Sequence, residues 1–254
     1  MTMRDSFLFS CEHGGNKIPA PYRALFRDSQ ALLATHRGYD FGALLLAKTL
    51  ADAFHAPLLS STVSRLLVDL NRSPGHPRLF SDATRSAPAA VREEILAKYY
   101  RPYRTQVAYL VGQAVSDGGR VIHIASHSFT PELGGKVRNA DVGLLYDPGR
   151  PAERALCLRW QAALARLSPN WRVRRNSPYV GNSDGLARDL RSRLSPQAYL
   201  GVELEVNQRI VLANGASWLG LRGLLADSLR ASWGSGGHPA GAGAQDFPAT
   251  KGTP

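Results

Sequence analysis

Short apolar runs along the chain alternate with longer stretches in which apolar and polar positions recur at helical spacing. Short apolar runs of this kind are typical of buried β-strands. They predict strands at residues 6–11, 57–62, 65–70, 120–126, 141–146, 171–175 and 199–206.

Helical spacing is clearest in "FGALLLAKTLADAF", residues 41–54, where Leu44, Leu45, Ala47, Ala51 and Phe54 can share one face. Three further stretches with this spacing predict helices at residues 88–116, 151–167 and 216–232. A proline disrupts a helix interior, so Pro102 predicts either two helices or one kinked helix within 88–116. Strands that alternate with helices predict an α/β fold, with a sheet flanked by helices on both faces.

The domain organisation follows from length and from a change in composition near the C-terminal end. A chain of 254 residues suits one large domain, which we place at residues 1–232. Residues 233–254 are rich in Gly, Ala and Pro and predict a disordered tail.

Basic residues outnumber acidic ones, 31 to 20. Such an excess favours anionic partners: nucleic acid, a membrane surface or an acidic small molecule. The arginines are dispersed, and the densest basic cluster is only "RVRR" at 172–175. We therefore expect no nucleic-acid or membrane partner, and a small anionic substrate instead.

The two cysteines, Cys11 and Cys157, lie far apart and match no metal-binding spacing. Their number predicts a reducing compartment. No run has the apolar length of a membrane span, and the N-terminus lacks the features of a secretory signal. We therefore expect a cytoplasmic protein; its oligomeric state is not predictable from the sequence.

Polar side chains gather at the carboxyl ends of the predicted strands, where open α/β sheets form their sites. They are Glu12, His13, Asp69, Asn71, Arg72, Ser126, His127, Ser128, Glu203 and Glu205. Two imidazoles, several carboxylates and an arginine could together hold a metal ion and an anionic substrate.

A purely structural explanation exists for several of these residues. His13 could cap a turn, and His127 could be a satisfied core residue. His123, four residues before His127, could be the real ligand or ordinary packing. Asp40 directly precedes an apolar helix, so helix N-capping would explain it.

The carboxylates on the last strand differ from the other candidates. Arg72 could simply pair with Asp69. Glu203 and Glu205, however, are two residues apart and share one face of the sheet. Two like charges there are costly unless a cation or a proton relieves them, which favours a functional role.

Other catalytic and phosphate-binding motifs are absent from the sequence. "GGNK" (14–17) and "GGK" (134–136) lack the full P-loop spacing. A G-x-S-x-G nucleophile elbow is also missing, which disfavours a serine hydrolase.

Six segments carry a family pattern in order: "CEHGGNKIP", "GYDFGA", "SRLLVDLNRS", "HSFTP", "NSPYVGNSDG" and "ELEVNQ". Over roughly residues 6–225 the chain resembles the N-formylglutamate amidohydrolase family. That family is similar in fold to the zinc carboxypeptidases and to the aspartoacylase and succinylglutamate desuccinylase group. The resemblance implies a zinc-exopeptidase-like mixed sheet, flanked by helices, with one zinc ion at the strand ends.

The resemblance implies a ligand set for the metal. His13 and His127 would be the two histidine ligands. Relatives in the wider fold place a glutamate three residues after the first histidine, where this chain has Asn16. The carboxylate would then come from Asp40, in the family's D-x-G-A pattern, with Glu12 as the alternative. Zinc is the expected ion, although similar ligands also accept cobalt or manganese.

The resemblance also implies the catalytic roles. Glu205 would be the general base that deprotonates water activated by zinc, with Glu203 as the rival register. Arg65 would stabilise the oxyanion. Asn71 and Arg72 would grip a substrate carboxylate.

The segment "NSPYVGNSDG" contributes further candidates. Asn176, Tyr179 and Asp184 would close over the substrate, although turn chemistry explains Asn, Pro, Gly and Asp equally well.

The implied reaction is hydrolysis of N-formyl-L-glutamate to formate and glutamate, as in histidine degradation. A peptidase or cell-wall-fragment amidase on the same fold is the alternative, and a basic nucleic-acid-binding protein without catalysis is a further one.

Overall fold

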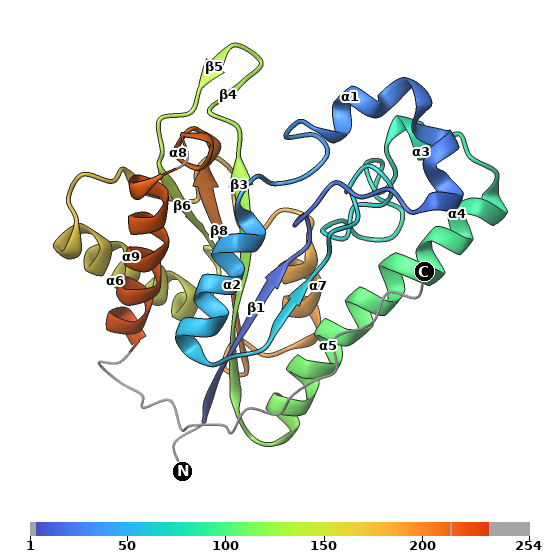
Figure 1. Ribbon diagram of the computed structural model, residues 1–254. Helices are drawn as coiled ribbons and strands as arrows, with labels where there is room; N and C mark the ends of the chain where they lie inside the picture. The colour runs from blue at the N-terminus through green and yellow to red at the C-terminus, as the bar shows by residue number, and fades with distance from the viewer. Residues whose placement is uncertain (1–3, 214, 234–254) are drawn as a thin grey trace.

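The computed structural model describes residues 4–213 and 215–233. Its core is a six-stranded mixed sheet in the order β2-β1-β3-β8-β6-β7 (Figure 1). The strands are β1 (Asp5–Cys11), β2 (Leu58–Ser60), β3 (Arg120–Phe129), β6 (Val142–Leu145), β7 (Val173–Arg175) and β8 (Tyr199–Asn207). The first four strands in this order run parallel, and β6 is antiparallel to β8.

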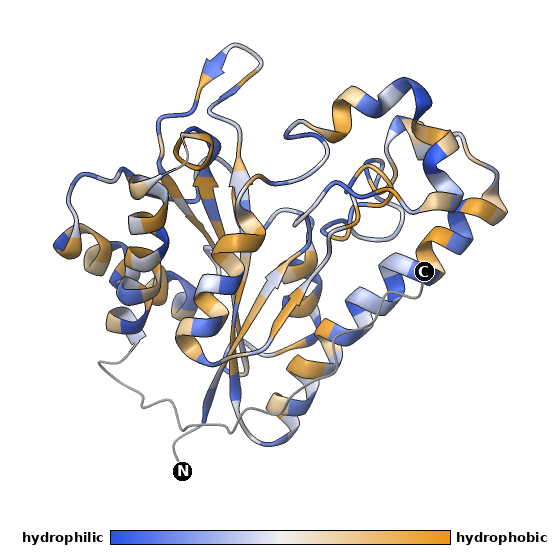
Figure 2. Ribbon diagram, viewed as in Figure 1, coloured by the Kyte–Doolittle hydropathy of each residue, from blue (hydrophilic) through white to orange (hydrophobic). Residues whose placement is uncertain are grey.

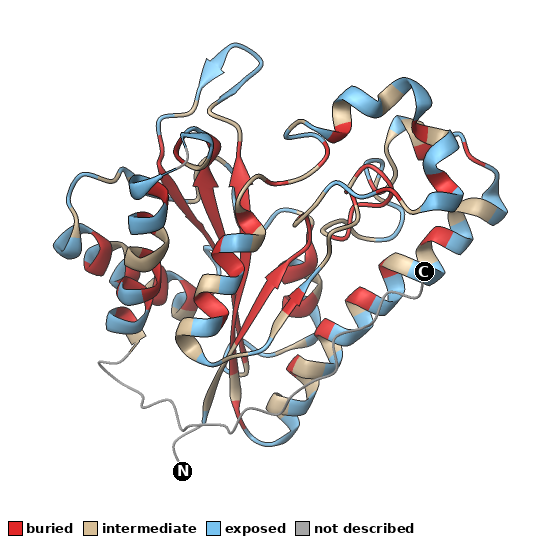
Figure 3. Ribbon diagram, in the orientation of Figure 1, coloured by how far each residue is buried: buried red, intermediate tan, exposed pale blue. Residues whose placement is uncertain are grey.

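Helices cover both faces of the sheet. On one face lie α2 (Ala43–Phe54), α6 (Pro151–Leu167) and α9 (Ala216–Trp233), and on the other lie α5 (Arg101–Ser116) and α7 (Leu186–Arg193) (Figure 1). The central strands are therefore buried on both sides, and they combine apolar side chains with several buried polar ones (Figures 2 and 3). The α/β fold predicted from the alternation of strands and helices is confirmed.

The remaining elements are short. They are η1 (a 3₁₀ helix, Ala20–Ser29), α1 (Gln30–Leu33), α3 (Asp82–Arg85), α4 (Ala89–Ile95), η2 (a π-helix, Leu96–Tyr100) and α8 (Gln208–Leu212), with a hairpin of β4 (Glu132–Leu133) and β5 (Lys136–Val137). Among the helices of the described residues, none has the length and apolar character needed to cross a membrane.

The helix predicted at 151–167 matches α6, and its termini explain why. Pro151 sits in the first turn, where a missing N–H costs nothing, and Glu153 and Arg166 suit the two ends of the helix dipole. Of the two alternatives for residues 88–116, a break into two helices is not found: α4 leads without interruption through the π-helix η2 into α5, and Pro102 lies in the first turn of α5.

The strand predicted at 65–70 is wrong. These residues form turns, although Leu67, Val68 and Leu70 are buried. The Ser64 hydroxyl accepts from the Leu66 N–H and donates to the Gly38 carbonyl, so local bonds replace a strand ladder. A buried apolar run looks the same in the sequence whether it is a strand or a packed loop.

The structure also bears on the predicted apolar face of residues 41–54 and on the predicted tail. The predicted apolar face of α2 is rotated: Leu46 and Leu50 are buried, whereas Leu45 is 46% exposed. The predicted tail begins at Trp233, which ends α9, and its other residues lie outside the described part of the chain.

Candidate metal centre

Three segments that are distant in sequence bring two imidazoles and one carboxylate together. His13 follows β1, His127 lies near the end of the adjacent β3, and Asp40 precedes α2. The Asp40 N–H donates to the His13 carbonyl at 2.9 Å, which fixes the loop before α2 against the end of β1. One ligand atom from each of the three side chains lies within 4.8 Å of the others, and all three residues are buried.

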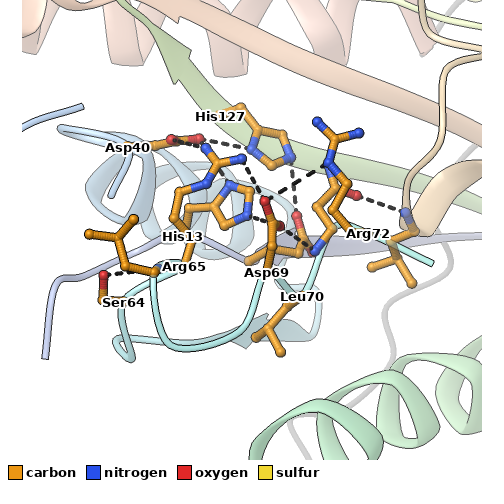
Figure 4. Close-up of polar contacts among 12 residues, drawn as sticks. His13, Asp40, Ser64, Arg65, Asp69, Leu70, Arg72 and His127 are labelled. Atoms are coloured by element: carbon orange, nitrogen blue, oxygen red, sulfur yellow. Dashed lines mark hydrogen bonds and ion pairs between the residues drawn. The ribbon is translucent and has the colours of Figure 1, made fainter. Parts of the chain in front are cut away.

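The geometry of the three side chains suits a tetrahedral ion. Asp40 Oδ2 lies 3.4 Å from His13 Nδ1 and 2.9 Å from His127 Nδ1 (Figure 4). Zinc ligands at about 2 Å in a tetrahedral arrangement are separated by about 3.3 Å. Two imidazole nitrogens and one carboxylate oxygen form a common zinc-binding set that leaves a fourth position open.

The outer nitrogen of each imidazole faces its own carboxylate. His13 Nε2 lies 2.7 Å from Asp69 Oδ1, and His127 Nε2 lies 3.1 Å from Glu12 Oε2. The Tyr103 hydroxyl donates to the other Glu12 oxygen at 2.8 Å. Carboxylates behind histidine ligands fix the ring and its tautomer, so both Nδ1 atoms are presented toward Asp40. The residues therefore fit a divalent metal ion.

Glu12, the alternative third ligand, lies outside this cluster. It is completely buried and contacts the far side of the His127 ring, whereas Asp40 contacts the Nδ1 side of both rings. The sequence identifies the acid but not this side-chain direction. Tyr103, which holds it, lies in α5 and gives no signal in the sequence.

The N-capping explanation for Asp40 is not what the structure contains. The N-cap of α2 is Gly42, which makes no side-chain capping bond. The Asp40 oxygens instead face the two imidazoles and Arg65, whose Nη1 donates to Oδ1 at 3.2 Å.

Arg65 bridges two carboxylates at the edge of the cluster. Besides Asp40, it contacts Asp69, with Nη2 at 2.9 Å from Oδ2 (Figure 4). Burial opposes its charge, but these two carboxylates raise the pKa of Arg65 above its usual value. Arg65 is thus a permanent positive charge beside the candidate metal ligands.

The electrostatic environment keeps Asp69, Asp40 and Glu12 ionised. Burial opposes their charge, but Arg65 and His13 hold the pKa of Asp69 well below its usual value. The pKa of Asp40 is likewise lowered, by His13, His127 and Arg65. Glu12 is brought to a pKa of about 2 against its own burial, chiefly by His127.

Glu205 lies opposite His127 and is the unpartnered acid of the site. The two residues are paired in the register of β8 and β3. Glu205 is 7% exposed, and its Oε2 has no hydrogen-bond partner in the described part of the chain. Burial is the largest cause that raises its pKa, to about 8. Such a carboxylate is suited to accepting a proton.

Glu203 lies two residue pairs deeper in the same sheet, opposite Ala125. Its Oε1 accepts from Asn71 Nδ2 at 3.4 Å, and burial raises its pKa. Of the two glutamates, only Glu205 is paired with a candidate metal ligand, His127.

The two candidate carboxylate clamps contact the segment before α7. Arg72 Nη1 donates to the Asp184 carbonyl at 2.9 Å, and Asn71 Oδ1 accepts from the Leu186 N–H at 2.7 Å. The proposed Arg72–Asp69 pair is long, at 4.0 Å. Arg72 therefore lies on the Asp69 side of the cluster (Figure 4), and the Asn71 N–H donates to Asp69 Oδ1 at 3.0 Å.

The three candidates in the segment after β7 differ in their contacts and in their exposure. Asn176 Oδ1 accepts from the N–H groups of Tyr146 and Gly181, at 2.9 and 3.2 Å, so its side chain organises the loop. Asp184 accepts from Ser73. Tyr179 is 43% exposed, and its hydroxyl accepts from Arg138 at 2.9 Å.

His123 belongs to the core and not to the cluster. Its Nδ1 lies 2.7 Å from the Tyr199 hydroxyl and its Nε2 2.8 Å from Ser10 Oγ. Burial lowers its pKa to about 4, so this ring is neutral near pH 7. Ordinary packing accounts for it.

Comparison with known proteins agrees with this geometry. Residues 5–212 match the family model of N-formylglutamate amidohydrolase. The fold is similar to that of the gene product Atu2144 from Agrobacterium tumefaciens, with a TM-score of 0.78 and 28% identity over 91% of each chain. It is also similar to N-formylglutamate amidohydrolase from Ralstonia eutropha JMP134, with a TM-score of 0.66 and 18% identity over 91% of this chain and 94% of that one. No curated protein matches the sequence.

Proposed function

The chain belongs to the N-formylglutamate amidohydrolase family, and from this premise we propose that it hydrolyses the amide bond of an N-acyl acidic amino acid, such as N-formyl-L-glutamate, with the help of one divalent metal ion. The ion would be held by His13, Asp40 and His127, and zinc suits this set of two imidazoles and one carboxylate. The observation that carries the proposal is the position of Asp40 Oδ2 between two imidazole Nδ1 atoms whose outer nitrogens face carboxylates.

The bound ion would polarise the amide carbonyl and lower the pKa of a nearby water molecule. Glu205 accepts the proton of the attacking water and passes it to the departing amine. Burial raises the pKa of Glu205 above that of a free carboxyl, which makes it a stronger base for accepting the proton. Its buried, unpartnered oxygen is free to make that contact.

Arg65 stabilises the negative charge that develops on the amide oxygen. Its guanidinium has five N–H donors, and its bonds to Asp40 and Asp69 hold it in place. Asn71 and Arg72 would hold a carboxylate of the substrate, with Arg72 providing a planar fork of donors. The segment at 184–186, which both contact, would fix their orientation.

The test is release of free amine from a panel of N-acyl amino acids, with N-formyl-L-glutamate as the expected best substrate. Glu205→Gln should retain the metal and lose about 100-fold or more of the turnover, because a general base is removed. Glu203→Gln is the matched control and should lose much less.

Three outcomes would contradict parts of this proposal. Unchanged turnover in Glu205→Gln would move the base to Glu203. Cleavage of peptides or cell-wall fragments in preference to N-acyl amino acids would replace the substrate. Absence of hydrolysis from the metal-loaded wild type across the panel would reject the activity.

A further inference from the structure

A pocket of about 400 Å³ lies between the β4–β5 hairpin and the loop after β7. Its lining residues are Leu133, Lys136, Val137, Arg138, Asn139, Ala140, Ser177 and Pro178. We call it the hairpin pocket. Its lining includes two cationic side chains and no carboxylate, so its chemistry favours an anion.

The hairpin pocket adjoins the face of the sheet that carries Glu205. Gly143 is paired with Glu205, and a methyl group on Gly143 would lie 3.3 Å from Glu205 Cβ and 2.3 Å from the Ser177 carbonyl oxygen. Ser177 and Glu205 therefore flank the same point of β6. Ser177, which lines the pocket, is therefore close to Glu205, which does not itself line it.

The hairpin is also fixed to the strand that carries the base. Asn207 lies two residues after Glu205 on the same face of β8. Its Nδ2 donates to the carbonyl oxygens of Arg138, at 3.1 Å, and Ala140, at 2.9 Å. The position of Arg138 relative to Glu205 is thus set by hydrogen bonds of a buried amide.

Arg138 is an ordered cation without an acidic partner. Its guanidinium lies 4.9 Å from the Tyr179 ring centre and 6.0 Å from that of Phe129, and it donates to the Tyr179 hydroxyl at 2.9 Å. Within residues 4–213 and 215–233, none of its contacts is an ion pair with a carboxylate. The two rings hold the guanidinium in place without neutralising its charge.

The aromatic contact with Phe129 places Arg138 near the end of β3. Phe129 lies two residues beyond His127 on the same face of β3, which corresponds to about 7 Å along the strand. The Arg138 guanidinium lies 6.0 Å from the Phe129 ring centre, so it is offset from His127 along β3. Arg72 lies on the other side, near Asp69.

From these contacts we infer that the hairpin pocket binds the side-chain carboxylate of an acidic N-acyl amino acid, and that Arg138 determines specificity for that second negative charge. The inference rests on the proposed amidohydrolase function. A dianionic substrate would place its α-carboxylate at Arg72 and its side-chain carboxylate at Arg138, with the amide between them. A planar guanidinium can bind that carboxylate through two parallel hydrogen bonds.

The experiment compares kcat/KM for N-formyl-L-glutamate with that for its neutral analogue N-formyl-L-glutamine. For Arg138→Met we expect the glutamate-to-glutamine preference to fall about tenfold or more, through KM for the glutamate compound. Arg138→Lys should restore part of the preference, because the charge remains and the fork is lost. Arg166→Met, at an exposed position of α6 outside the pocket, is the matched control and should change the preference less than about twofold.

A wild-type preference in Arg138→Met would overturn the inference and leave the proposed function intact. Equal losses on both compounds would also overturn it, since they would indicate a general structural effect. A metal-loaded wild type that hydrolyses neither compound, nor any other member of the panel, would overturn the proposed function and this inference with it.

Discussion

The contacts of Asp40 in the structure differ from the role that its position in the sequence suggests. Its position before an apolar helix is typical of an N-cap, yet its carboxylate contacts two imidazoles and a guanidinium instead. The sequence predicts which residue types gather at this edge, because the ends of parallel strands share it. Which oxygen faces which nitrogen depends on side-chain packing, so the position of Glu12 behind His127 was not predictable.

Glu12→Gln should weaken zinc binding by about 10–100-fold, because an uncharged amide replaces the carboxylate behind His127. Competition with a chromophoric chelator measures this affinity without requiring activity. Glu132→Gln, which changes an exposed acid in the hairpin, is the matched control and should bind zinc as the wild type does. Equal affinities of Glu12→Gln and wild type would show that the contact is not part of the metal centre.

Glu205 should make the metal-free protein less stable as the pH rises. Its pKa is raised from 4.5 to about 8 in the folded chain, with burial as the largest cause. Between these values the folded chain holds one more proton than the unfolded chain, so this contribution to stability falls with increasing pH. The stability of the Glu205→Gln variant relative to the wild type should therefore increase with pH.

We expect the free energy of unfolding of Glu205→Gln, relative to the wild type, to increase by about 3 kcal/mol between pH 5 and pH 8. Urea unfolding in the presence of a chelator checks this difference. Glu132→Gln should show no such trend. A relative stability that stays constant or falls with pH would contradict the raised pKa.

At the scale of elements, α2 depends on the glycine of the D-x-G-A pattern. Gly42 has φ of +74°, and a methyl group there would lie 2.5 Å from Val211 Cγ1. Gly42→Ala should therefore lower the free energy of unfolding by about 1–3 kcal/mol and weaken metal binding, because Asp40 is two residues away. Gly112→Ala in α5, where nothing lies within 4 Å, should be neutral or stabilising by up to about 1 kcal/mol.

Thermal and urea unfolding of both variants test this difference. Similar stabilities of Gly42→Ala and Gly112→Ala would mean that the entry to α2 can relax without cost.

Elements with a strong period were predictable, and those shaped by tertiary contacts were not. The helix at 151–167 carries its own start and stop signals and was predicted to the residue. The segment 65–70 resembles a strand because its apolar side chains are all buried, but they pack as a loop beneath α5 and α7. Helix α7 was missed because five of its eight residues are polar or charged, even though Leu186 and Leu190 pack into the core.

At the scale of the whole molecule, one buried ion pair joins the sheet, α6 and the loop after β7. Arg191 Nε lies 2.9 Å from Glu153 Oε1, and its other nitrogens donate to the carbonyl oxygens of Gly181 and Gly201. Glu153 in turn accepts from the N–H groups of Gly201 and Asp147. Every polar atom of this pair thus has a structural partner.

Arg191→Met should cost about 3–5 kcal/mol of stability, because Glu153 would remain buried without its counter-charge. Arg193, on the same helix, pairs with Asp189 at an exposed position, so Arg193→Met should cost less than about 1 kcal/mol. Urea titration of the two variants measures both values. A cost for Arg191→Met no larger than that for Arg193→Met would contradict a structural role for the buried pair.

The proposed function depends most on the binding of a divalent ion by His13, Asp40 and His127. The most direct measurement is the zinc stoichiometry of the protein after loading and exhaustive dialysis. We expect one zinc ion per chain for the wild type and for His36→Ala, an exposed control, and a large loss of bound zinc for His127→Ala. A full complement of zinc in folded His127→Ala would contradict this expectation.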